Sequence, residues 1–167
     1  MGGNEAGQAI HITGGVSMNS QDRERMGVAL EEARKALAEG EIPVGAALYR
    51  GDTLLWADHN RREQLHDPTA HAEMICLRHG AMEKGDWRLK DCTLYVTLEP
   101  CPMCAGAIMS ARISRLVYGA TDARAGAVES IFNIPGHPSL APSPIITAGV
   151  MEDECKTLLQ SFFAARR

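Results

Sequence analysis

Two short segments of the sequence carry side chains that could bind a metal and move protons. The first contains His71 and Glu73, and the second contains Cys101 and Cys104, three residues apart. Cysteines at this spacing on a helix face the same side, and a helix N-terminus favours their thiolate form. With one histidine from a neighbouring helix they would make a His-Cys-Cys set. Such a set suits tetrahedral zinc and leaves the fourth coordination position open.

An open position on zinc is typical of a catalytic centre, because the metal can hold and acidify a water molecule there. Glu73 follows the predicted histidine ligand by two residues. Its carboxylate could lie beside that water without binding the metal and could carry protons. We therefore predict His71, Cys101 and Cys104 as zinc ligands and Glu73 as the proton-transferring residue.

Two other interpretations of the pair Cys101 and Cys104 stay open. The pair could be half of a structural zinc site, for which Cys76 or Cys92 is the candidate fourth ligand. It could also be a redox pair, although a thioredoxin-like motif is expected earlier in a chain, near a βαβ unit. A structural site has no need of an acid at position 73, so Glu73 favours the catalytic interpretation.

The elements that must hold these residues follow from hydrophobic periodicity and turn signals. Apolar residues at helical spacing from Met26 to Leu37 predict a first helix that begins at an N-cap near Ser20 and stops at Gly40. Short β-rich runs between turns predict five strands, of which the last is the least regular. The predicted strands cover residues 44–49, 53–57, 93–98, 115–119 and 145–147.

Three further helices are predicted, and two of them carry the chemistry. Thr69 can cap the helix that holds His71, and Pro100 suits the first turn of the helix that holds both cysteines. A last helix is expected from 151 to 165. The alternation of helices and strands predicts one α/β domain over residues 20–167, in which helices cover both faces of a mixed sheet of about five strands.

Composition excludes several classes of protein. Of 167 residues, 45% are hydrophobic and 23% are charged, which is ordinary for a globular domain. A net charge of −4 argues against a broad basic face that coats duplex nucleic acid. No apolar run approaches the length of a membrane span, and five cysteines without a secretory signal do not suit a disulfide scaffold. Residues 1–19 are glycine-rich and indicate a flexible N-terminal arm or leader.

The H-x-E and P-C-x-x-C segments, taken together, match the signature of zinc deaminases. Over residues 21–167 the chain resembles the cytidine and deoxycytidylate deaminase superfamily, and most closely the bacterial tRNA-specific adenosine deaminases. The segments that carry the resemblance are IPVGA at 42–46, HDPTAHAE at 66–73, TLYVTLEPCPMCAGA at 93–107 and RISRLVYGATDARAG at 112–126.

The resemblance implies a three-layer α-β-α fold and one zinc ion in each subunit. It places the zinc ligands on His71, Cys101 and Cys104 and the proton shuttle on Glu73. It also implies a homodimer, with the pocket completed near the subunit interface. The absence of a secretory signal and the unpaired cysteines favour the cytoplasm.

The resemblance further implies residues that contact the substrate. The base-binding asparagine of the family falls on Asn60, which could instead simply hold a loop. A loop that touches the anticodon nucleotides matches residues 122–126, with Arg124 in place of a lysine, although Asp122 and Arg124 could be ordinary turn residues. The other implied pocket residues are Val44, Ala46, Ala72 and Pro100.

Several positions depart from the family pattern. His59 stands where a tryptophan often precedes the pocket asparagine, and Arg62 stands where a proline often follows it. Glu129 replaces a glycine and adds an acid near the expected path of RNA, while Ala141 and Pro142 replace an Asn-His pair. These changes leave the zinc chemistry intact and bear on the RNA contacts.

The resemblance implies hydrolytic deamination of adenosine to inosine at the wobble position of tRNA, with the anticodon loop as partner. An alternative is a deaminase of a free nucleobase or nucleoside, such as guanine, cytosine or adenosine, that uses the same zinc site. A second alternative is a zinc-stabilised binding module without activity. The intact set of His71, Glu73, Cys101 and Cys104 argues against the binding module.

Overall fold

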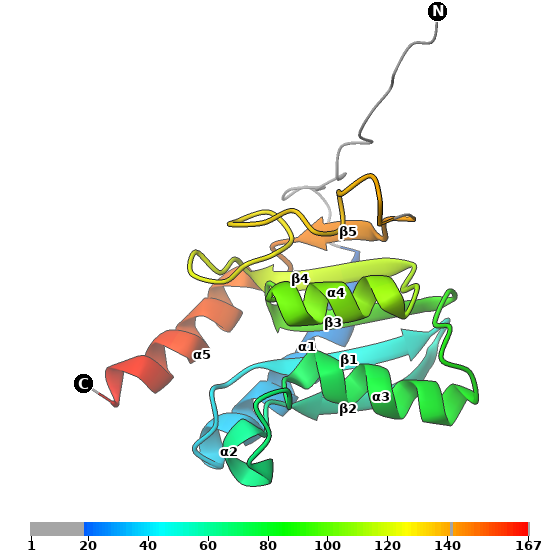
Figure 1. The fold of residues 1–167 in the computed structure, drawn as a ribbon. Coiled ribbons are helices and arrows are strands. Elements are labelled where there is room, and N and C mark those ends of the chain that lie inside the picture. Colours follow the sequence, from blue (N-terminus) through cyan, green and yellow to red (C-terminus); the bar gives the residue numbers. More distant parts are fainter. Residues whose placement is uncertain (1–18, 141, 167) are drawn as a thin grey trace, which may run out of the picture.

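The structure is a computed structural model that describes residues 19–140 and 142–166, so nearly all of the predicted arm at 1–19 lies outside the described residues. Five strands form a sheet in the order β2-β1-β3-β4-β5 (Figure 1). β1 pairs antiparallel with β2 and β3, whereas β4 pairs parallel with β3 and β5. The strands are β1 (Gly45–Arg50), β2 (Thr53–His59), β3 (Cys92–Leu98), β4 (Arg115–Ala120) and β5 (Ile145–Ala148).

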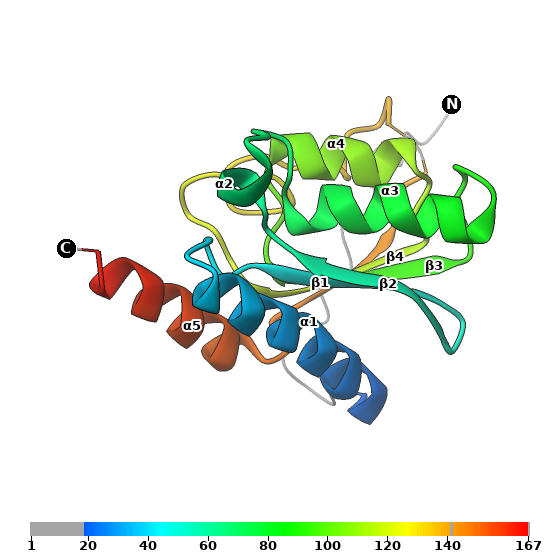
Figure 2. The same cartoon turned by 90° about the horizontal axis from the view of Figure 1, so that it is seen from below.

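Helices cover both faces of this mixed sheet, which confirms the predicted three-layer α-β-α architecture. Seen along the sheet, α1 and α5 lie on one side and α3 and α4 lie together on the other (Figure 2). None of the helices in the described part of the chain has the length and apolar character that a membrane crossing needs. The helices are α1 (Ser20–Ala38), α2 (Arg62–Leu65), α3 (Ala72–Lys84), α4 (Pro102–Ser110) and α5 (Glu152–Ala164).

The sheet divides the core into two clusters, because successive side chains of a strand point to opposite faces. Leu94 and Val96 of β3 pack in the cluster beneath α3 and α4. Tyr95, between them, packs in the cluster beneath α1 and α5. Both faces of β3 are therefore buried, and its sequence is apolar without alternation, as expected for a central strand.

Three predicted helix starts differ from the structure in the residue that stands at the start. Asn19, not Ser20, caps α1, where its side chain accepts a hydrogen bond from the backbone N–H of Gln21 at 3.0 Å. Thr69 does not cap α3, because its hydroxyl and N–H donate to Asp67. Proline suits a first helical turn, but the one that occupies it in α4 is Pro102 and not Pro100.

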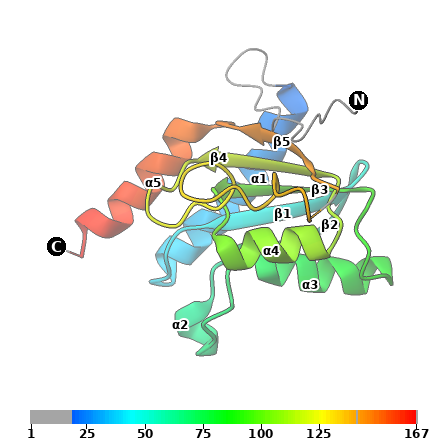
Figure 3. The ribbon, with the colours of Figure 1, turned by 45° about the horizontal axis from the view of Figure 1, so that its top comes forward.

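The sequence analysis did not predict α2, whose four residues are too few for a periodic signal. After β4, residues 121–140 form an irregular segment that lies beside the N-terminal end of α4 (Figure 3). The N–H of Ala127 in this segment donates to the carbonyl oxygen of Pro100 at 2.8 Å. The segment is therefore attached to the chain just before the cysteine helix.

Candidate functional site

The three predicted zinc ligands come together where two helices begin side by side. His71 is the residue immediately before α3, Cys101 is the residue immediately before α4, and Cys104 lies in the first turn of α4. One ligand atom from each lies within 4.8 Å of the others. The Nδ1 atom of His71 is 3.6 Å from Sγ of Cys101 and 3.5 Å from Sγ of Cys104.

These separations fit a zinc ion. With Zn–S near 2.3 Å, Zn–N near 2.05 Å and tetrahedral angles, a sulfur and a nitrogen on one ion are about 3.6 Å apart. The two observed nitrogen–sulfur distances agree with that value. Two thiolates and one imidazole are also a donor set that zinc prefers, and they leave one position for a non-protein ligand.

The structure gives no support to a structural site with a fourth cysteine. Among the described residues, the cluster of ligand atoms around His71 contains neither Cys76 nor Cys92. The Cys76 thiol donates to the carbonyl oxygen of Ala46 at 3.5 Å, and the Cys92 thiol lies against Asp91. Both are buried, as is common for cysteines that pack as small hydrophobic residues.

Hydrogen bonding within the cluster prepares a thiolate ligand. The pKa of Cys101 falls to about 4, because the Cys104 thiol donates to its sulfur and His71 lies beside it. A thiolate at position 101 is the form that binds metal. Cys101 and Cys104 are not joined in a disulfide, and neither is any other cysteine of the described chain.

Glu73 projects from the first turn of α3 into a pocket of about 270 Å³ that also exposes His71 and Cys101. Its side chain is nearly enclosed, with 4% of the residue exposed. Burial raises the pKa of Glu73 above the usual range of a carboxyl. A carboxyl beside the predicted metal ligands, at the wall of a small pocket, can exchange protons with a molecule held there.

Some of the residues predicted to contact substrate line this pocket. Val44, at the entrance to β1, Asn60, Ala72 and Asp122 all do so. The volume is close to the lower end of ligand pockets, which suits one base better than a length of nucleic acid.

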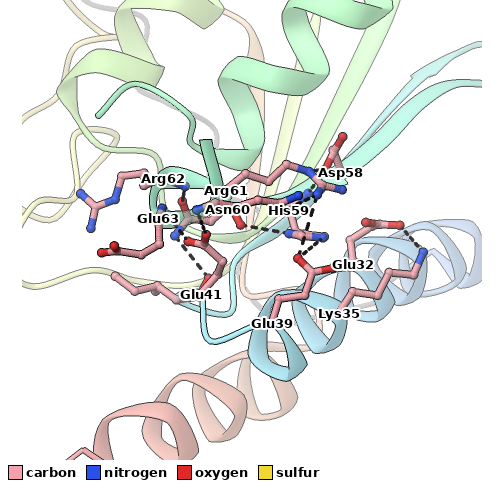
Figure 4. A network of polar contacts seen from close by, with 12 residues as sticks. Glu32, Lys35, Glu39, Glu41, Asp58, His59, Asn60, Arg61, Arg62 and Glu63 are labelled. Atoms are coloured by element: carbon pink, nitrogen blue, oxygen red, sulfur yellow. Dashed lines mark hydrogen bonds and ion pairs between the residues drawn. The ribbon is translucent and has the colours of Figure 1, made fainter. Parts of the chain in front are cut away.

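Asn60 lines the pocket and also holds its own loop, and its contact with a base stays a prediction. Its Nδ2 donates to the carbonyl oxygen of Ile42 at 3.4 Å, and its Oδ1 accepts from the N–H of Arg62 at 3.2 Å (Figure 4). Behind it, His59 is fully buried, with Nδ1 3.0 Å from the Asn60 carbonyl oxygen and Nε2 3.4 Å from Glu39. His59 thus supports the loop from the side away from the pocket.

The other predicted contacts lie outside the pocket wall. Ala46 is fully buried in the core cluster beneath α3 and α4, opposite Val96 in the sheet. Pro100 is buried next to Cys101, and its carbonyl oxygen accepts from Ala127. Arg124 is exposed, and its backbone N–H donates to the Asp122 carboxylate.

The departures from the family pattern have different surroundings. Arg62 lines the pocket. The Glu129 carboxylate accepts a hydrogen bond from the hydroxyl of Tyr118, so this acid is tied to strand β4. Pro142 is exposed, and Ala141 lies outside the described residues.

Sequence reasoning missed five residues that line the pocket. Glu99 is the most informative, because it is an acid with only 2% of its surface exposed, placed between β3 and the cysteine helix. A charged residue at the end of an apolar strand, directly before the cysteine segment, was the available signal. The missed residues are Ile42, Arg62, Leu98, Glu99 and Ala125.

Comparison with known proteins agrees with this geometry. The family model described as the cytidine and deoxycytidylate deaminase zinc-binding region matches residues 19–120. The chain is 47% identical over 147 residues to a tRNA-specific adenosine deaminase of Haemophilus influenzae, covering 87% of this chain and 85% of that protein. It is 45% identical over 155 residues, 83% of this chain, to a chloroplastic tRNA(adenine(34)) deaminase of Arabidopsis thaliana, of which it spans only 12%.

Two solved structures are similar in fold and sequence. One, described for A-to-I editing by tRNA deaminases at the wobble position of transfer RNA, has a TM-score of 0.79 and 42% identity, over 81% of this chain and 98% of that chain. The other is a guanine deaminase from Nitrosomonas europaea, with a TM-score of 0.71 and 27% identity, over 89% and 86%. The chain belongs to the cytidine and deoxycytidylate deaminase family, among the relatives of the tRNA-specific adenosine deaminases.

Proposed function

We propose that this protein is a zinc-dependent hydrolase that converts adenosine to inosine at the wobble position of tRNA and releases ammonia. The observation that carries the proposal is the His71, Cys101 and Cys104 cluster in one pocket with buried Glu73. The relatives at 45% and 47% identity, which are named as tRNA adenosine deaminases, support the choice of substrate.

The residues of the chain have distinct parts in the proposed reaction. His71 Nδ1 and the two cysteine sulfurs would hold zinc, which when bound supplies a Lewis acid that acidifies water. Glu73 takes a proton from the water that attacks C6 of adenine and delivers it to N1 of the ring. Glu73 then carries the proton of the new C6 hydroxyl group to the amino group, the C6–N bond breaks as the C6=O bond of inosine forms, and ammonia leaves.

An RNA substrate would present its target base outside a helix, because a paired base cannot enter so small a pocket. A second hollow of about 450 Å³ shares Ile42, Asn60 and Arg62 with the first and adds Phe162 and Arg166 from the C-terminal end. The Arg166 guanidinium lies 3.5 Å from the centre of the Phe162 ring. The Phe162 ring is buried beneath Arg166, and an arginine guanidinium binds phosphates, so we propose that a neighbouring nucleotide binds in this hollow.

The second candidate function is deamination of a free nucleobase or nucleoside. The pocket of about 270 Å³ would accept a base without any RNA attached, and a guanine deaminase shares the fold at 27% identity. This function needs the same zinc ligands and Glu73, but it makes no use of the second hollow.

The two functions are separated by measuring ammonia and inosine with two sets of substrates. The zinc-loaded protein is incubated with an anticodon stem-loop that has a wobble adenosine, and with a panel of free bases and nucleosides. We expect inosine in the RNA and little ammonia from the panel. Arg166→Ala should slow the reaction on RNA. Ammonia from a free base, with the RNA unchanged, would contradict the proposal and support the alternative.

We further propose that the protein is a cytoplasmic homodimer, as the family resemblance implies. A reducing compartment would keep the Cys101 and Cys104 thiols free to bind zinc. Sedimentation at micromolar concentration should give twice the mass of 18.1 kDa. A monomer at that concentration would refute the dimer.

A further inference from the structure

The Glu99 carboxylate has no part in the reaction proposed above, yet it is one of the most enclosed charged groups in the described chain. Only 2% of the residue is exposed, and it follows directly after β3, two residues before the zinc ligand Cys101. It also lines the substrate pocket. A buried carboxylate is unfavourable unless hydrogen bonds compensate for the loss of water.

All of the contacts that stabilise this carboxylate come from one loop, residues 122–130. Its Oε2 accepts from the backbone N–H groups of Val128 at 3.1 Å, Glu129 at 2.9 Å and Ser130 at 3.0 Å. Its Oε1 accepts from the N–H of Asp122 at 3.1 Å and from the Ser130 hydroxyl. These five donors compensate the buried carboxylate for the loss of water.

Gly126 of the loop also shows how closely the loop approaches the Glu99 side chain. A Cβ atom added to Gly126 would lie 2.4 Å from Cδ of Glu99 and 2.5 Å from the carbonyl oxygen of Asp122. Only a residue without a side chain can occupy this position while the loop wraps around the carboxylate. Ala127 of the same loop donates to Pro100, the residue after Glu99, at 2.8 Å.

We infer that Glu99 is a positioning residue that holds the 122–130 loop in place as one wall of the substrate pocket. The loop supplies Asp122 and Ala125 to that wall, whereas Glu99 itself is joined through Pro100 to Cys101. The carboxylate thus sets the position of the loop relative to the metal centre. This inference rests on the proposed function in that the loop is taken to meet the RNA substrate.

A positioning role predicts an effect on substrate binding that is larger than the effect on the chemical step. In Glu99→Gln one acceptor oxygen becomes an NH₂ group, which faces N–H or O–H donors and cannot accept from them. We expect the KM for the anticodon stem-loop to rise about tenfold or more, as for loss of a hydrogen bond to a charged group, while kcat falls less than about threefold. Zinc content should stay at one per chain.

Hydrogen exchange gives a readout that needs no substrate. The backbone amides of residues 122 and 128–130 should exchange about tenfold faster in Glu99→Gln, because they lose their acceptor. Glu83→Gln is the matched control, since Glu83 is exposed on α3 about 15 Å along the helix from Glu73. It should change neither KM nor exchange in the loop.

Two milder variants keep the test decisive if Glu99→Gln does not fold. Gly126→Ala pushes the loop away from an intact Glu99, and Ser130→Ala removes one of the five donors. Both should raise KM and speed exchange in residues 122–130, with the larger effect in Gly126→Ala. Unchanged KM and unchanged exchange in the folded variants would overturn the inference. If the wild type acts on free bases only, the proposed function fails, but the exchange measurement still tests the contact.

Discussion

At the scale of single residues, the residues predicted to bind metal are different from the residue predicted to transfer protons. The predicted ligands His71 and Cys101 are half-buried, and Cys104 is buried. Glu73 is the second residue of α3, the helix that His71 directly precedes, so a single helix start places the predicted ligand and the predicted proton carrier side by side. Metal binding and proton transfer can therefore be tested by separate substitutions.

Glu73→Gln should abolish turnover without loss of the metal. The amide keeps the size of the side chain but cannot accept a proton, and general acid–base groups contribute about 10²–10⁴-fold in rate. Deamination kinetics with metal analysis of the same preparation measures both effects. Near-normal activity in Glu73→Gln would remove Glu73 from the mechanism, and Glu83→Gln serves as the control for a neutralised carboxylate.

At the scale of elements, α1 packs so closely on the sheet that a glycine is required at the contact. A Cβ added to Gly45 at the start of β1 would lie 1.9 Å from the carbonyl oxygen of Ala29 and 2.6 Å from the backbone nitrogen of Ala33. These are backbone atoms of a helix, which cannot move singly. The contact matters for the site, because Val44, directly before Gly45, lines the pocket.

Gly45→Ala should destabilise the protein, whereas Gly27→Ala should stabilise it. The first substitution forces α1 away from β1, and overpacking of this kind costs about 1–3 kcal/mol or more. Gly27 lies on α1 with nothing within 4 Å of an added Cβ, so alanine there gains about 1 kcal/mol of helix propensity. Urea unfolding measures both free energies. Equal stability of the two variants would show that the helix contact is looser than described.

A second contact between elements ties α1 to β3 and β4 through charge. The Asp22 carboxylate accepts two hydrogen bonds from Arg115, at 2.8 and 2.7 Å, and one from the Tyr95 hydroxyl at 2.7 Å. Burial raises the pKa of Asp22, but the hydrogen bonds from Arg115 and Tyr95 exceed this effect and lower it overall. A lowered pKa in the folded state means that ionised Asp22 stabilises the fold.

Asp22→Asn should therefore cost stability in a way that depends on pH. The contribution of ionised Asp22 is fully present above its unfolded pKa of about 4, and it is lost as pH falls through the lower pKa of the folded state. We expect a loss of about 1–3 kcal/mol at pH 7 that shrinks at pH 3. Urea unfolding of both proteins at the two pH values measures this difference. Glu24→Gln, on the exposed side of α1, should show no such dependence.

At the scale of the whole molecule, the predicted metal ligands come from parts of the chain that are about thirty residues apart. His71 begins α3 and the two cysteines begin α4, so a bound zinc ion would link the two helices on one face of the sheet. A ligand that binds only the folded state stabilises it by mass action. Metal content should therefore govern stability as well as activity.

Removal of zinc with a chelator should abolish deamination and lower the Tm by about 8–16 °C. This is the stabilisation expected from a ligand that is present at about a thousand times its Kd and binds only the folded protein. Added zinc should restore both. Cys104→Ala should behave like the chelated protein, whereas Cys76→Ala should keep one zinc per chain. Loss of zinc in the folded Cys76→Ala variant would reopen the structural-site interpretation. Tm and metal analysis provide the measurements.

Much of the fold was predictable because its signals are local. The five strands and the four long helices lie within a few residues of their predicted bounds, since alternation, helical spacing and glycine stops act over short distances. The differences are at the caps, where Asn19 and Pro102 take positions expected for Ser20 and Pro100. Capping depends on which of several adjacent polar residues or prolines has the right backbone angles, and spacing alone does not decide that.

The structure brings His71, Cys101 and Cys104 together, as residue type and spacing predicted, and Glu73 lines the same pocket. Their roles in zinc binding and proton transfer stay predictions. The residues that line the pocket were not all predicted, because long-range packing brings them together. Val44 and Ala46, two residues apart, both pack in the core cluster beneath α3 and α4, but only Val44 also lines the pocket. Glu99 was passed over, and only the tertiary structure shows five donors around it from a loop more than twenty residues away.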